Sequence, residues 1–431
     1  MGLLSLNMIS DKIKLDFKKI GKTMYIKRHL EEQIKSASKS YPVVMVCGQR
    51  QVGKSTMLYH IKENERKYVT LDDRNAKMLA EKDPALFLEN YGTPVLIDEI
   101  QRAPGLLLEI KRFVDERALK GENCNGLFWL TGSQRFRMMK GVSETLSGRI
   151  AVFEMAGLSA REIEGREACL FSPDLEALKV QAKHAPSANV LKTFENIFTG
   201  SMPKVISEKV DRERYYQNYV NTYLERDIRD LAQVGNLDRF YEFLVYMAAR
   251  TAQQLNFNDI AKNIGISAPT AKHWVSILES SGVLYLLRPY SGNLTKRLTK
   301  SPKAYFTDTG LAAYLCRWPD YKTLEEGPMN GAFFETYVVS EILKSCYNAG
   351  IEPNIYYYRD SDKNEIDLIF VQGDKLYPAE IKKAKSPDNA DKSFRQLKGA
   401  KANVMPGLVI CSADQFAPYS RDAWLCPLTL I

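Results

Sequence analysis

The amino-acid sequence predicts an α/β fold whose first unit is a parallel sheet covered by helices on both faces. Short valine- and leucine-rich runs, typical of strands buried on both faces, recur at residues 42–47, 69–71, 95–97, 127–130 and 150–153. Helix-compatible stretches, such as residues 106–119, lie between these runs, and a glycine-containing loop joins the first run to a helical segment. Strands that alternate with helices in this way are typical of a parallel sheet.

The composition is that of a globular chain large enough for several domains. Of 431 residues, 45% are hydrophobic and 26% are charged. At about 100 to 200 residues per domain, this length predicts two to four domains. No uninterrupted apolar run approaches the ~18 residues of a membrane span, and the N-terminus lacks a cationic segment followed by an apolar one. We therefore expect no membrane partner and a cytoplasmic location.

The cysteine and charge counts exclude some classes of site and leave others open. Seven scattered cysteines without a CxxC pair predict reduced thiols and no structural zinc. The 60 Lys and Arg residues exceed the 52 Asp and Glu residues by a margin that permits a polyanionic partner without requiring one.

Changes in pattern divide the chain into five segments. Residues 1–23 carry several lysines and few large apolar residues, which predicts a mobile basic leader, and Met24 is a candidate start. Residues 24–155 contain the alternation of strands and helices, and the strand pattern then gives way to helical periodicity over residues 156–236, which predicts a helical lid. The remaining segments are a predicted winged helix at residues 237–303 and a C-terminal α/β domain at residues 304–431.

A phosphate-binding loop follows the first predicted strand. The motif GxxxxGK[ST] is matched by Gly48, Gln49, Arg50, Gln51, Val52, Gly53, Lys54 and Ser55. The glycines let backbone amides turn toward a phosphate, and the N-terminus of the following helix adds partial positive charge there. We expect Lys54 to neutralise the β and γ phosphates of ATP and Ser55 to bind Mg²⁺, with Thr56 completing the loop.

Acidic and small polar residues follow two further strands. Asp98 and Glu99 directly follow the apolar run at residues 95–97. We expect Asp98 to hold Mg²⁺ and Glu99 to act as the base that activates water. Ser133 or Thr131, after the run at residues 127–130, is the candidate γ-phosphate sensor; the alternative is that these residues cap the next helix. Arg149 is a candidate arginine finger for a neighbouring subunit, with a structural salt bridge as the alternative.

Four phrases of the sequence resemble those of a known family. These phrases are residues 48–55, the string Asp-Glu-Ile-Gln-Arg-Ala-Pro at 98–104, residues 130–134 and residues 146–149. Together they resemble the AAA-type ATP-binding family of the archaeal-type ATPase class, whose members carry a C-terminal domain of unknown function 4143. The resemblance covers residues from about 24 to the end and is supported by a further string at residues 223–228. It implies an AAA-class nucleotide switch.

The pattern over residues 255–287 predicts a helix, a turn, a second helix and a strand. Gly265 supplies the turn and Ser267 the N-cap of the second helix, which predicts a helix-turn-helix within a winged helix. The predicted wing, residues 289–303, contains four cations and no acid. Such a patch suits contact with the phosphate backbone of a nucleic acid, whatever its base sequence. The predicted DNA or RNA contacts are Lys296, Arg297, Lys300 and Lys303. The alternative is that this unit packs against the ATPase or binds a protein partner.

Carboxylates on a predicted hairpin form the second candidate catalytic site. Asp367 lies on one strand, and Glu380 and Lys382 share a face of the next if the hairpin closes at residues 372–375. Two carboxylates would hold Mg²⁺ or Mn²⁺ while Lys382 activates water, and Glu335 on the preceding helix supplies a third acid. This arrangement resembles the PD-(D/E)xK nuclease core, although Ile366 stands where that pattern has Pro. The alternative is surface charge on an edge hairpin.

Two main functional hypotheses follow from these motifs. The first is an ATP-hydrolysing AAA-class protein whose nucleotide state repositions a winged helix and a nuclease-like module on nucleic acid. The second is an ATP-gated protein-binding or regulatory switch with an inactive nuclease-like domain. A purely signalling use of the ATPase and a homo-oligomer are both left open.

Overall fold

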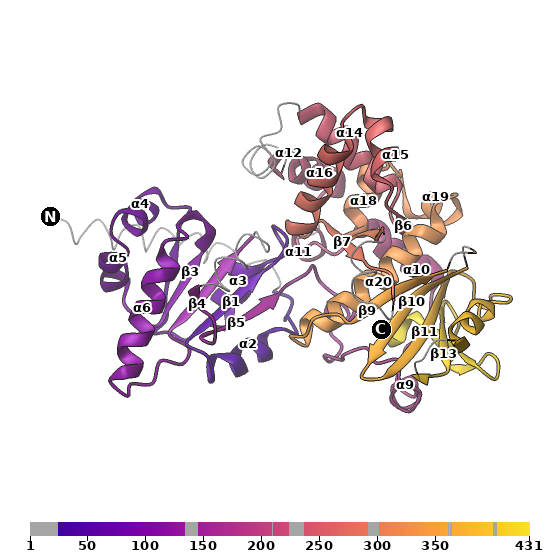
Figure 1. Ribbon diagram of the computed structural model, residues 1–431, viewed down its shortest axis with the longest axis horizontal. Helices are drawn as coiled ribbons and strands as arrows, with labels where there is room; N and C mark the ends of the chain where they lie inside the picture. Colours follow the sequence, from indigo (N-terminus) through magenta and orange to yellow (C-terminus); the bar gives the residue numbers. More distant parts are fainter. Residues whose placement is uncertain are drawn as a thin grey trace.

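The computed structural model describes residues 25–133, 145–208, 210–223, 237–291, 301–360, 362, 364–399 and 403–431. The predicted basic leader and residues 296, 297 and 300 of the predicted wing lie outside the described residues. The unit labelled on the left of Figure 1 is a parallel sheet with helices on both sides. Its strands are β1 (Val43–Cys47), β2 (Lys67–Thr70), β3 (Val95–Asp98), β4 (Phe128–Gly132) and β5 (Ile150–Glu154), in the spatial order β2-β3-β4-β1-β5. The predicted parallel sheet is confirmed.

The three central strands of this sheet, β1, β3 and β4, are buried on both faces, as their continuous apolar sequences require. Side chains alternate between the faces, so that Val43 and Met45 pack on one side and Val44 and Val46 on the other. The first face is covered by α4 (Arg74–Lys82), α5 (Pro84–Tyr91) and α6 (Leu106–Leu119). The second is covered by α2 (Glu31–Ser38) and α3 (Lys54–Ile61). A short turn of helix, η1 (Ile100–Arg102), follows β3.

The described part of residues 156–223 consists of helices and connecting loops. The helices are α8 (Ala160–Ile163), α9 (Leu175–Ala182), α10 (Val190–Thr199), α11 (Pro203–Ser207) and α12 (Arg212–Tyr223). Their buried apolar residues, among them Phe194, Ile197 and Tyr216, join the same core as one face of the sheet. This helical segment therefore connects the sheet to the rest of the molecule.

The next unit has the predicted helix-turn-helix followed by strands. It contains α14 (Leu237–Ala249), β6 (Gln253–Gln254), α15 (Phe257–Ile264), α16 (Ala268–Ser280), β7 (Leu284–Leu287) and β8 (Lys303–Phe306). Gly265 ends α15 in the left-handed conformation with φ of +73°, which suits glycine, and the Ser267 side chain caps α16 by accepting from the Thr270 amide. The three strands form an antiparallel sheet in the order β6-β8-β7.

The C-terminal unit is a mixed sheet packed against a long helix. Three helices come first, α18 (Thr309–Leu315), α19 (Tyr321–Glu326) and α20 (Asn330–Asn348). The strands are β9 (Ile355–Arg359), β10 (Glu365–Gln372), β11 (Lys375–Lys382), β12 (Asn403–Val404), β13 (Gly407–Cys411), β14 (Ala417–Pro418) and β15 (Ala423–Pro427), with the short helices η3 (Lys392–Gly399) and η4 (Leu428–Leu430). The main path of the sheet is β14-β15-β13-β11-β10-β9, and β12 pairs with β11.

The predicted hairpin is present, since Gln372 pairs with Lys375 across the β10–β11 turn. One face of the sheet, including Ile369 and Val409, packs on Phe394 of η3. The other face, including Leu368 and Ile410, joins the core that contains α20.

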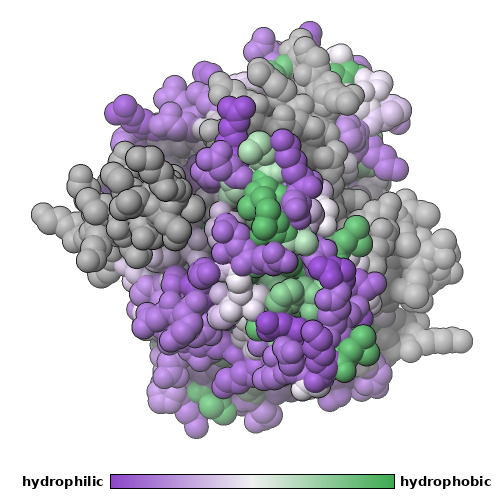
Figure 2. Space-filling view, turned by 90° about the vertical axis from the view of Figure 1, so that its left-hand side faces the viewer, coloured by the Kyte–Doolittle hydropathy of each residue, from purple (hydrophilic) through white to green (hydrophobic). Residues whose placement is uncertain are grey.

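One side of the molecule is mainly hydrophilic, and the cysteines form no disulfide among the described residues. Hydrophilic residues predominate on the side of the molecule seen in Figure 2, and hydrophobic residues form only small groups among them. Within the described ranges, no helix is both long and apolar enough to cross a membrane. All seven cysteines are free.

Candidate functional site: a phosphate-binding loop and a carboxylate cluster

The loop between β1 and α3 has a backbone that only glycine fits at its first position. Gly48 has φ of +140°, and a Cβ placed on it would lie 2.1 Å from the carbonyl oxygen of Met155. Gly53 has φ of +93° and caps the N-terminus of α3. The predicted order of strand, glycine loop and helix is confirmed. The loop ends at the N-terminus of α3, where backbone amides favour the binding of an anion.

Lys54 folds back over this loop. Its Nζ donates to the carbonyl oxygens of Gly48 and Gln49, at 2.8 Å each, and the residue is 6% exposed. Burial lowers the pKa of the Lys54 ammonium, while the nearby Glu99 opposes this shift. The ammonium therefore lies inside the loop, where neutral carbonyls accept its hydrogen bonds.

Asp98, at the end of β3, accepts hydrogen bonds from hydroxyl groups on three other elements. Ser55 Oγ and Thr131 Oγ1 each donate to Asp98 Oδ1 at 2.5 Å, and the Tyr68 hydroxyl donates to Oδ2 at 3.2 Å. Because β4 lies between β1 and β3, the end of β4 brings Thr131 between the loop and the acid. A carboxylate beside a serine hydroxyl is an oxygen donor set that suits Mg²⁺.

Glu99 follows Asp98 in a conformation that few side chains adopt. Its φ is +59°, in the left-handed region. Its carboxylate accepts from Gln101 Nε2 and, at 3.3 Å, from Ser133 Oγ, and Gln101 also donates to Ser133 Oγ at 3.0 Å. The Glu99 amide donates to Thr131 Oγ1 at 3.1 Å. The left-handed turn thus directs the Glu99 carboxylate away from Asp98 and toward Ser133.

A pocket of about 330 Å³ lies over the loop. Most of the predicted cofactor-binding residues line it; the full lining is Arg50, Gln51, Gly53, Lys54, Ser55, Thr56, Glu99, Tyr219 and Thr222. Gly48, Gln49, Val52 and Ser133 are not in this lining, and the Val52 side chain is fully buried in the core. Tyr219 and Thr222 come from α12, far along the chain, and the sequence analysis gave them no role.

The C-terminal carboxylates surround a lysine. Lys303, on β8, is 3% exposed, and its Nζ lies 2.6 Å from Glu365, 3.1 Å from Glu335 and 3.6 Å from Asp367. We call Glu335, Glu365 and Asp367 the carboxylate cluster. Burial opposes ionisation of Lys303, but these three carboxylates outweigh it and raise the pKa of the ammonium. Assigning Lys303 to a nucleic-acid-binding wing was therefore wrong, because its side chain is buried in an ionic contact.

Glu380 and Lys382 pair with each other beside this cluster. Lys382 Nζ lies 2.8 Å from Glu380 Oε1, and Asp367 Oδ2 accepts from the Ile381 amide at 2.9 Å. Burial and the nearby Asp367 raise the pKa of Glu380 to about 7, and burial and Asp367 likewise raise that of Glu335 to about 7. Glu335 and Asp367 thus both contact the Lys303 ammonium, whereas Glu380 pairs with Lys382.

The predicted C-terminal metal site stays a prediction. In the parts of the chain that the structure describes, no three His, Cys, Asp or Glu side chains are placed to hold a metal ion. In this structure the positive charge beside Glu335 and Asp367 is the Lys303 ammonium.

Two units of the chain match known protein families. A family described as an AAA domain matches residues 40–164, which contain the loop and Asp98, and a domain of unknown function (DUF4143) matches residues 330–431. The chain combines an AAA domain with a C-terminal DUF4143 domain. A further domain of unknown function (DUF8612) matches residues 191–322 and so spans the boundaries predicted at residues 236 and 303.

Similar proteins are themselves uncharacterized. A protein of Mycobacterium tuberculosis is 27% identical over 368 residues, covering 84% of this chain and 75% of the relative. A protein of Methanocaldococcus jannaschii is 22% identical over 361 residues, covering 75% of this chain and 72% of the relative. The structure of a Walker-type ATPase of Pyrococcus abyssi is 13% identical and covers 68% of this chain and 96% of its own, with a TM-score of 0.43.

Arg149 lies at the far edge of the sheet of the AAA domain. It precedes β5 at the amino end of the strands, whereas the loop follows their carboxyl ends, and its Nε lies 2.5 Å from Asp115 Oδ1. In this chain Arg149 is thus remote from its own loop and held by a salt bridge. An action on a neighbouring subunit stays a prediction.

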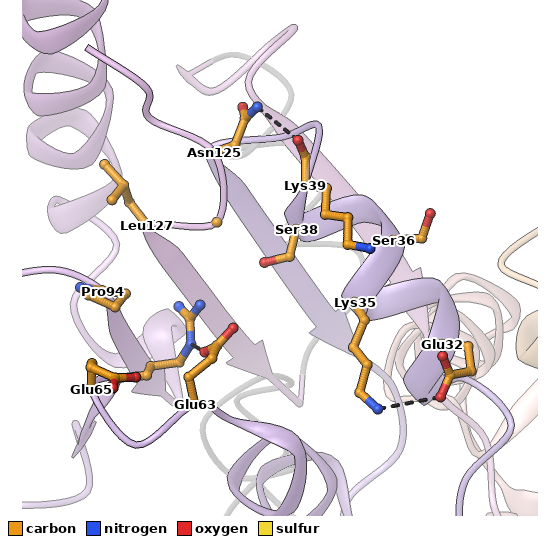
Figure 3. Close-up of a pocket in the computed structure, with 12 residues that line it drawn as sticks. Glu32, Lys35, Ser36, Ser38, Lys39, Glu63, Glu65, Pro94, Asn125 and Leu127 are labelled. Carbon is orange, nitrogen blue, oxygen red and sulfur yellow. Dashed lines mark hydrogen bonds and ion pairs between the residues drawn. The ribbon is translucent and has the colours of Figure 1, made fainter.

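A larger hollow of about 640 Å³ also lies at this amino edge of the AAA domain, beside Pro94 and Leu127 (Figure 3). Cations and acids are mixed along it, with Lys35 paired to Glu32 and Arg66 paired to Glu63. The Arg66 guanidinium stacks on Trp129, 3.9 Å from the ring centroid. This hollow is larger than the pocket over the loop, but it lies at the opposite edge of the sheet. It is therefore not the site that the loop would form for a nucleotide.

Proposed function

We propose that the AAA domain binds ATP with Mg²⁺ at the loop and hydrolyses it. The observation that carries this proposal is that Lys54 and Ser55 line one pocket at the start of α3 and that Asp98 accepts a hydrogen bond from Ser55. Each group has the chemistry that a magnesium triphosphate needs: an ammonium for the phosphates, a hydroxyl and a carboxylate for the metal, and helix amides for the negative charge.

The residues around the pocket would act in distinct ways. Lys54 exchanges its neutral carbonyl partners for the β and γ phosphates, and Ser55 and Asp98 hold the Mg²⁺, which neutralises charge on the phosphate oxygens. Glu99 accepts the proton of the attacking water, while Ser133 and Gln101 fix its carboxylate. Tyr219 and Thr222 close the pocket from α12.

Phosphate release by purified protein with Mg²⁺ and ATP tests this proposal. Lys54→Ala should lose nucleotide binding and turnover together, because the phosphates lose their main counter-charge. Glu99→Gln should still bind ATP but lose turnover by about 100-fold or more, because it keeps the shape of the side chain and removes the base. Wild-type turnover in either variant would contradict these assignments.

We propose that the unit formed by α14, α15, α16 and the β7–β8 hairpin is a winged helix that contacts nucleic acid. Its order of helix, turn, helix and hairpin supports a winged helix, and the cations Lys296, Arg297 and Lys300 fall between β7 and β8. Phosphate contacts by these three residues would make DNA binding strongly dependent on salt.

Neutralising Lys296, Arg297 and Lys300 together should weaken DNA binding and reduce its salt slope by about 3. A matched control neutralises the exposed Lys82, Lys120 and Lys322, which lie outside this unit, and should leave the slope unchanged. Binding that does not vary with salt would favour a protein partner instead.

The position of Lys303 favours our second hypothesis for the DUF4143 domain, a regulatory switch with an inactive nuclease-like fold. Lys303 already neutralises the acids that a nuclease would use to hold its metal. Linear or branched DNA incubated with Mn²⁺ should therefore be cut no faster by the wild type than by Asp367→Ala. Cutting that Asp367→Ala abolishes would restore the nuclease hypothesis.

A further inference from the structure

Strand β8 contacts both the phosphate-binding loop and the carboxylate cluster. Lys303 begins the strand, and Thr307 follows its last residue. At about 3.3 Å per residue, the two positions are roughly 13 Å apart along an extended chain. The strand is held between β6 and β7, and Ala304, Tyr305 and Phe306 are almost completely buried. A rigid segment of this kind passes a displacement at one end to the other.

The loop end of the contact is made by Gln49. This residue belongs to the loop motif but is 4% exposed and is not part of the lining of the nucleotide pocket. Gln49 Nε2 donates to the Tyr219 hydroxyl at 2.9 Å. Gln49 Oε1 lies 3.3 Å from Thr307 Oγ1, whose hydroxyl also lies 2.6 Å from the Gly282 carbonyl oxygen. Gly282 packs on the same residue, since a Cβ placed on it would lie 3.2 Å from the Gln49 amide nitrogen. Gln49 thus connects the backbone of the loop to the residue after β8.

The other end of β8 is held by charge. Lys303 contacts all three members of the carboxylate cluster, and Tyr305, two residues along on the same face, donates its hydroxyl to Glu335 Oε1 at 2.6 Å. Because Lys303, Tyr305 and Asp367 are buried, a small shift of β8 changes ionic contacts that are largely shielded from solvent.

The loop has a reason to change when a triphosphate binds. In this structure the Gln49 carbonyl accepts directly from the Lys54 ammonium at 2.8 Å. A bound triphosphate competes for that ammonium with a far stronger charge, so the Gln49 carbonyl loses its donor and its peptide unit is released. The other contacts of Gln49 lead to Thr307 and β8.

We propose that Gln49, Thr307 and β8 couple nucleotide occupancy of the loop to the carboxylate cluster of the DUF4143 domain. Gln49 acts as a positioning residue, and Lys303 is the group whose ionic contacts report the nucleotide state. This coupling rests on the ATP binding proposed above, because the competition for Lys54 requires a triphosphate.

Amide hydrogen exchange of the full chain, with and without Mg²⁺ and a non-hydrolysable ATP analogue, tests the coupling. In the wild type, the exchange rates of amides in β8 and in the first part of β10 should change by about fivefold or more, the lower bound of a typical coupling between sites. Thr307→Ser keeps the hydroxyl and should respond in the same way. Thr307→Val removes the hydroxyl at nearly constant volume, and its β8 should no longer respond although the analogue still binds.

A second measurement uses the reciprocity of coupling and does not depend on the stability of Thr307→Val. Glu365→Gln weakens the hold on Lys303, so it should change the Kd for the analogue by about fivefold or more. Asp374→Asn removes the same charge from the exposed turn of the same hairpin and should leave that Kd unchanged.

The outcomes separate the two proposals. If the analogue binds but β8 exchange is unaltered in the wild type, or if Thr307→Val responds as fully as Thr307→Ser, the coupling is refuted and ATP binding stands. An unchanged Kd in Glu365→Gln also refutes the coupling. If the analogue does not bind the wild type, the proposed function fails and the coupling fails with it.

Discussion

Gly48 shows how a single residue decides the shape of the nucleotide site. Its φ of +140° and the closeness of the Met155 carbonyl leave no room for a side chain. We expect Gly48→Ala to lower the free energy of unfolding by about 1 to 3 kcal/mol, because alanine must either strain its backbone or displace Met155. Urea unfolding of the two proteins measures this difference.

Gly331→Ala is the matched control for Gly48→Ala. Gly331 lies in helix α20, and a Cβ placed on it meets nothing within 4 Å. This variant should be more stable than the wild type by about 0.5 to 1 kcal/mol, the usual gain of alanine over glycine in a helix. Equal effects at Gly48 and Gly331 would show that the loop does not require glycine.

At the scale of elements, the short helix α8 ties the loop to the segment that leads away from the sheet. Glu162 of α8 accepts from Arg28 Nε at 3.0 Å and from the His29 amide at 2.9 Å, and both charged side chains are almost fully buried. Arg28 also donates to the carbonyls of Val52 in the loop and Ala156 after β5, at 2.8 Å each. A buried ion pair therefore joins three segments at this point.

Removing the charge of Glu162 should be costly at neutral pH and less so in acid. Although burial opposes ionisation, Arg28 and the Ser159 and His29 amides lower the pKa of Glu162. The folded-state pKa is therefore below the unfolded one, so this stabilisation is complete above about pH 4.3 and is lost as the pH falls through the folded pKa. We expect Glu162→Gln to cost about 3 kcal/mol at pH 7, and less below about pH 4.

Glu164→Gln is the control for this prediction. Glu164 pairs with Arg166 at 2.7 Å but is largely solvent-exposed, so its loss should cost less than about 1 kcal/mol. Unfolding measured at pH 7 and at pH 3.5 checks both variants. A cost for Glu162→Gln that is equal at the two pH values would mean that the ion pair does not stabilise α8.

Elements formed by neighbouring residues could be predicted from the sequence, and contacts between distant segments could not. The loop, its helix, Asp98 and the β10–β11 turn follow from short motifs, because each depends on a few adjacent residues. Tyr219 and the Gln49–Thr307 contact gave no signal, because each joins segments more than 150 residues apart. Lys303 was misassigned because its spacing from the other cations does not show that β8 turns its first side chain into the C-terminal unit.

At the scale of the whole molecule, one apolar core runs through all the units. Trp129 of the AAA domain, Phe240 and Trp274 of the next unit, and Phe334 and Ile410 near the C-terminus belong to the same cluster of buried side chains. Because these units share a core, we expect unfolding by urea to be a single cooperative transition rather than a series of separate ones.

Circular dichroism and tryptophan fluorescence should therefore give coincident unfolding curves. Mg²⁺ and ATP at 100 times the Kd should raise the free energy of unfolding by about 2.7 kcal/mol, because the ligand binds only the folded chain. Two separated transitions, of which ATP shifts only one, would show that the AAA domain folds independently of the rest.

The central claim is that the loop holds a nucleoside triphosphate, and isothermal titration calorimetry of the full chain measures this directly. With Mg²⁺ present, ATP should give a saturable heat with the wild type and none with Lys54→Ala, while Gly331→Ala binds as the wild type does. If the folded wild-type protein gives no saturable heat with ATP, or if Lys54→Ala binds ATP with the wild-type Kd, the account is contradicted.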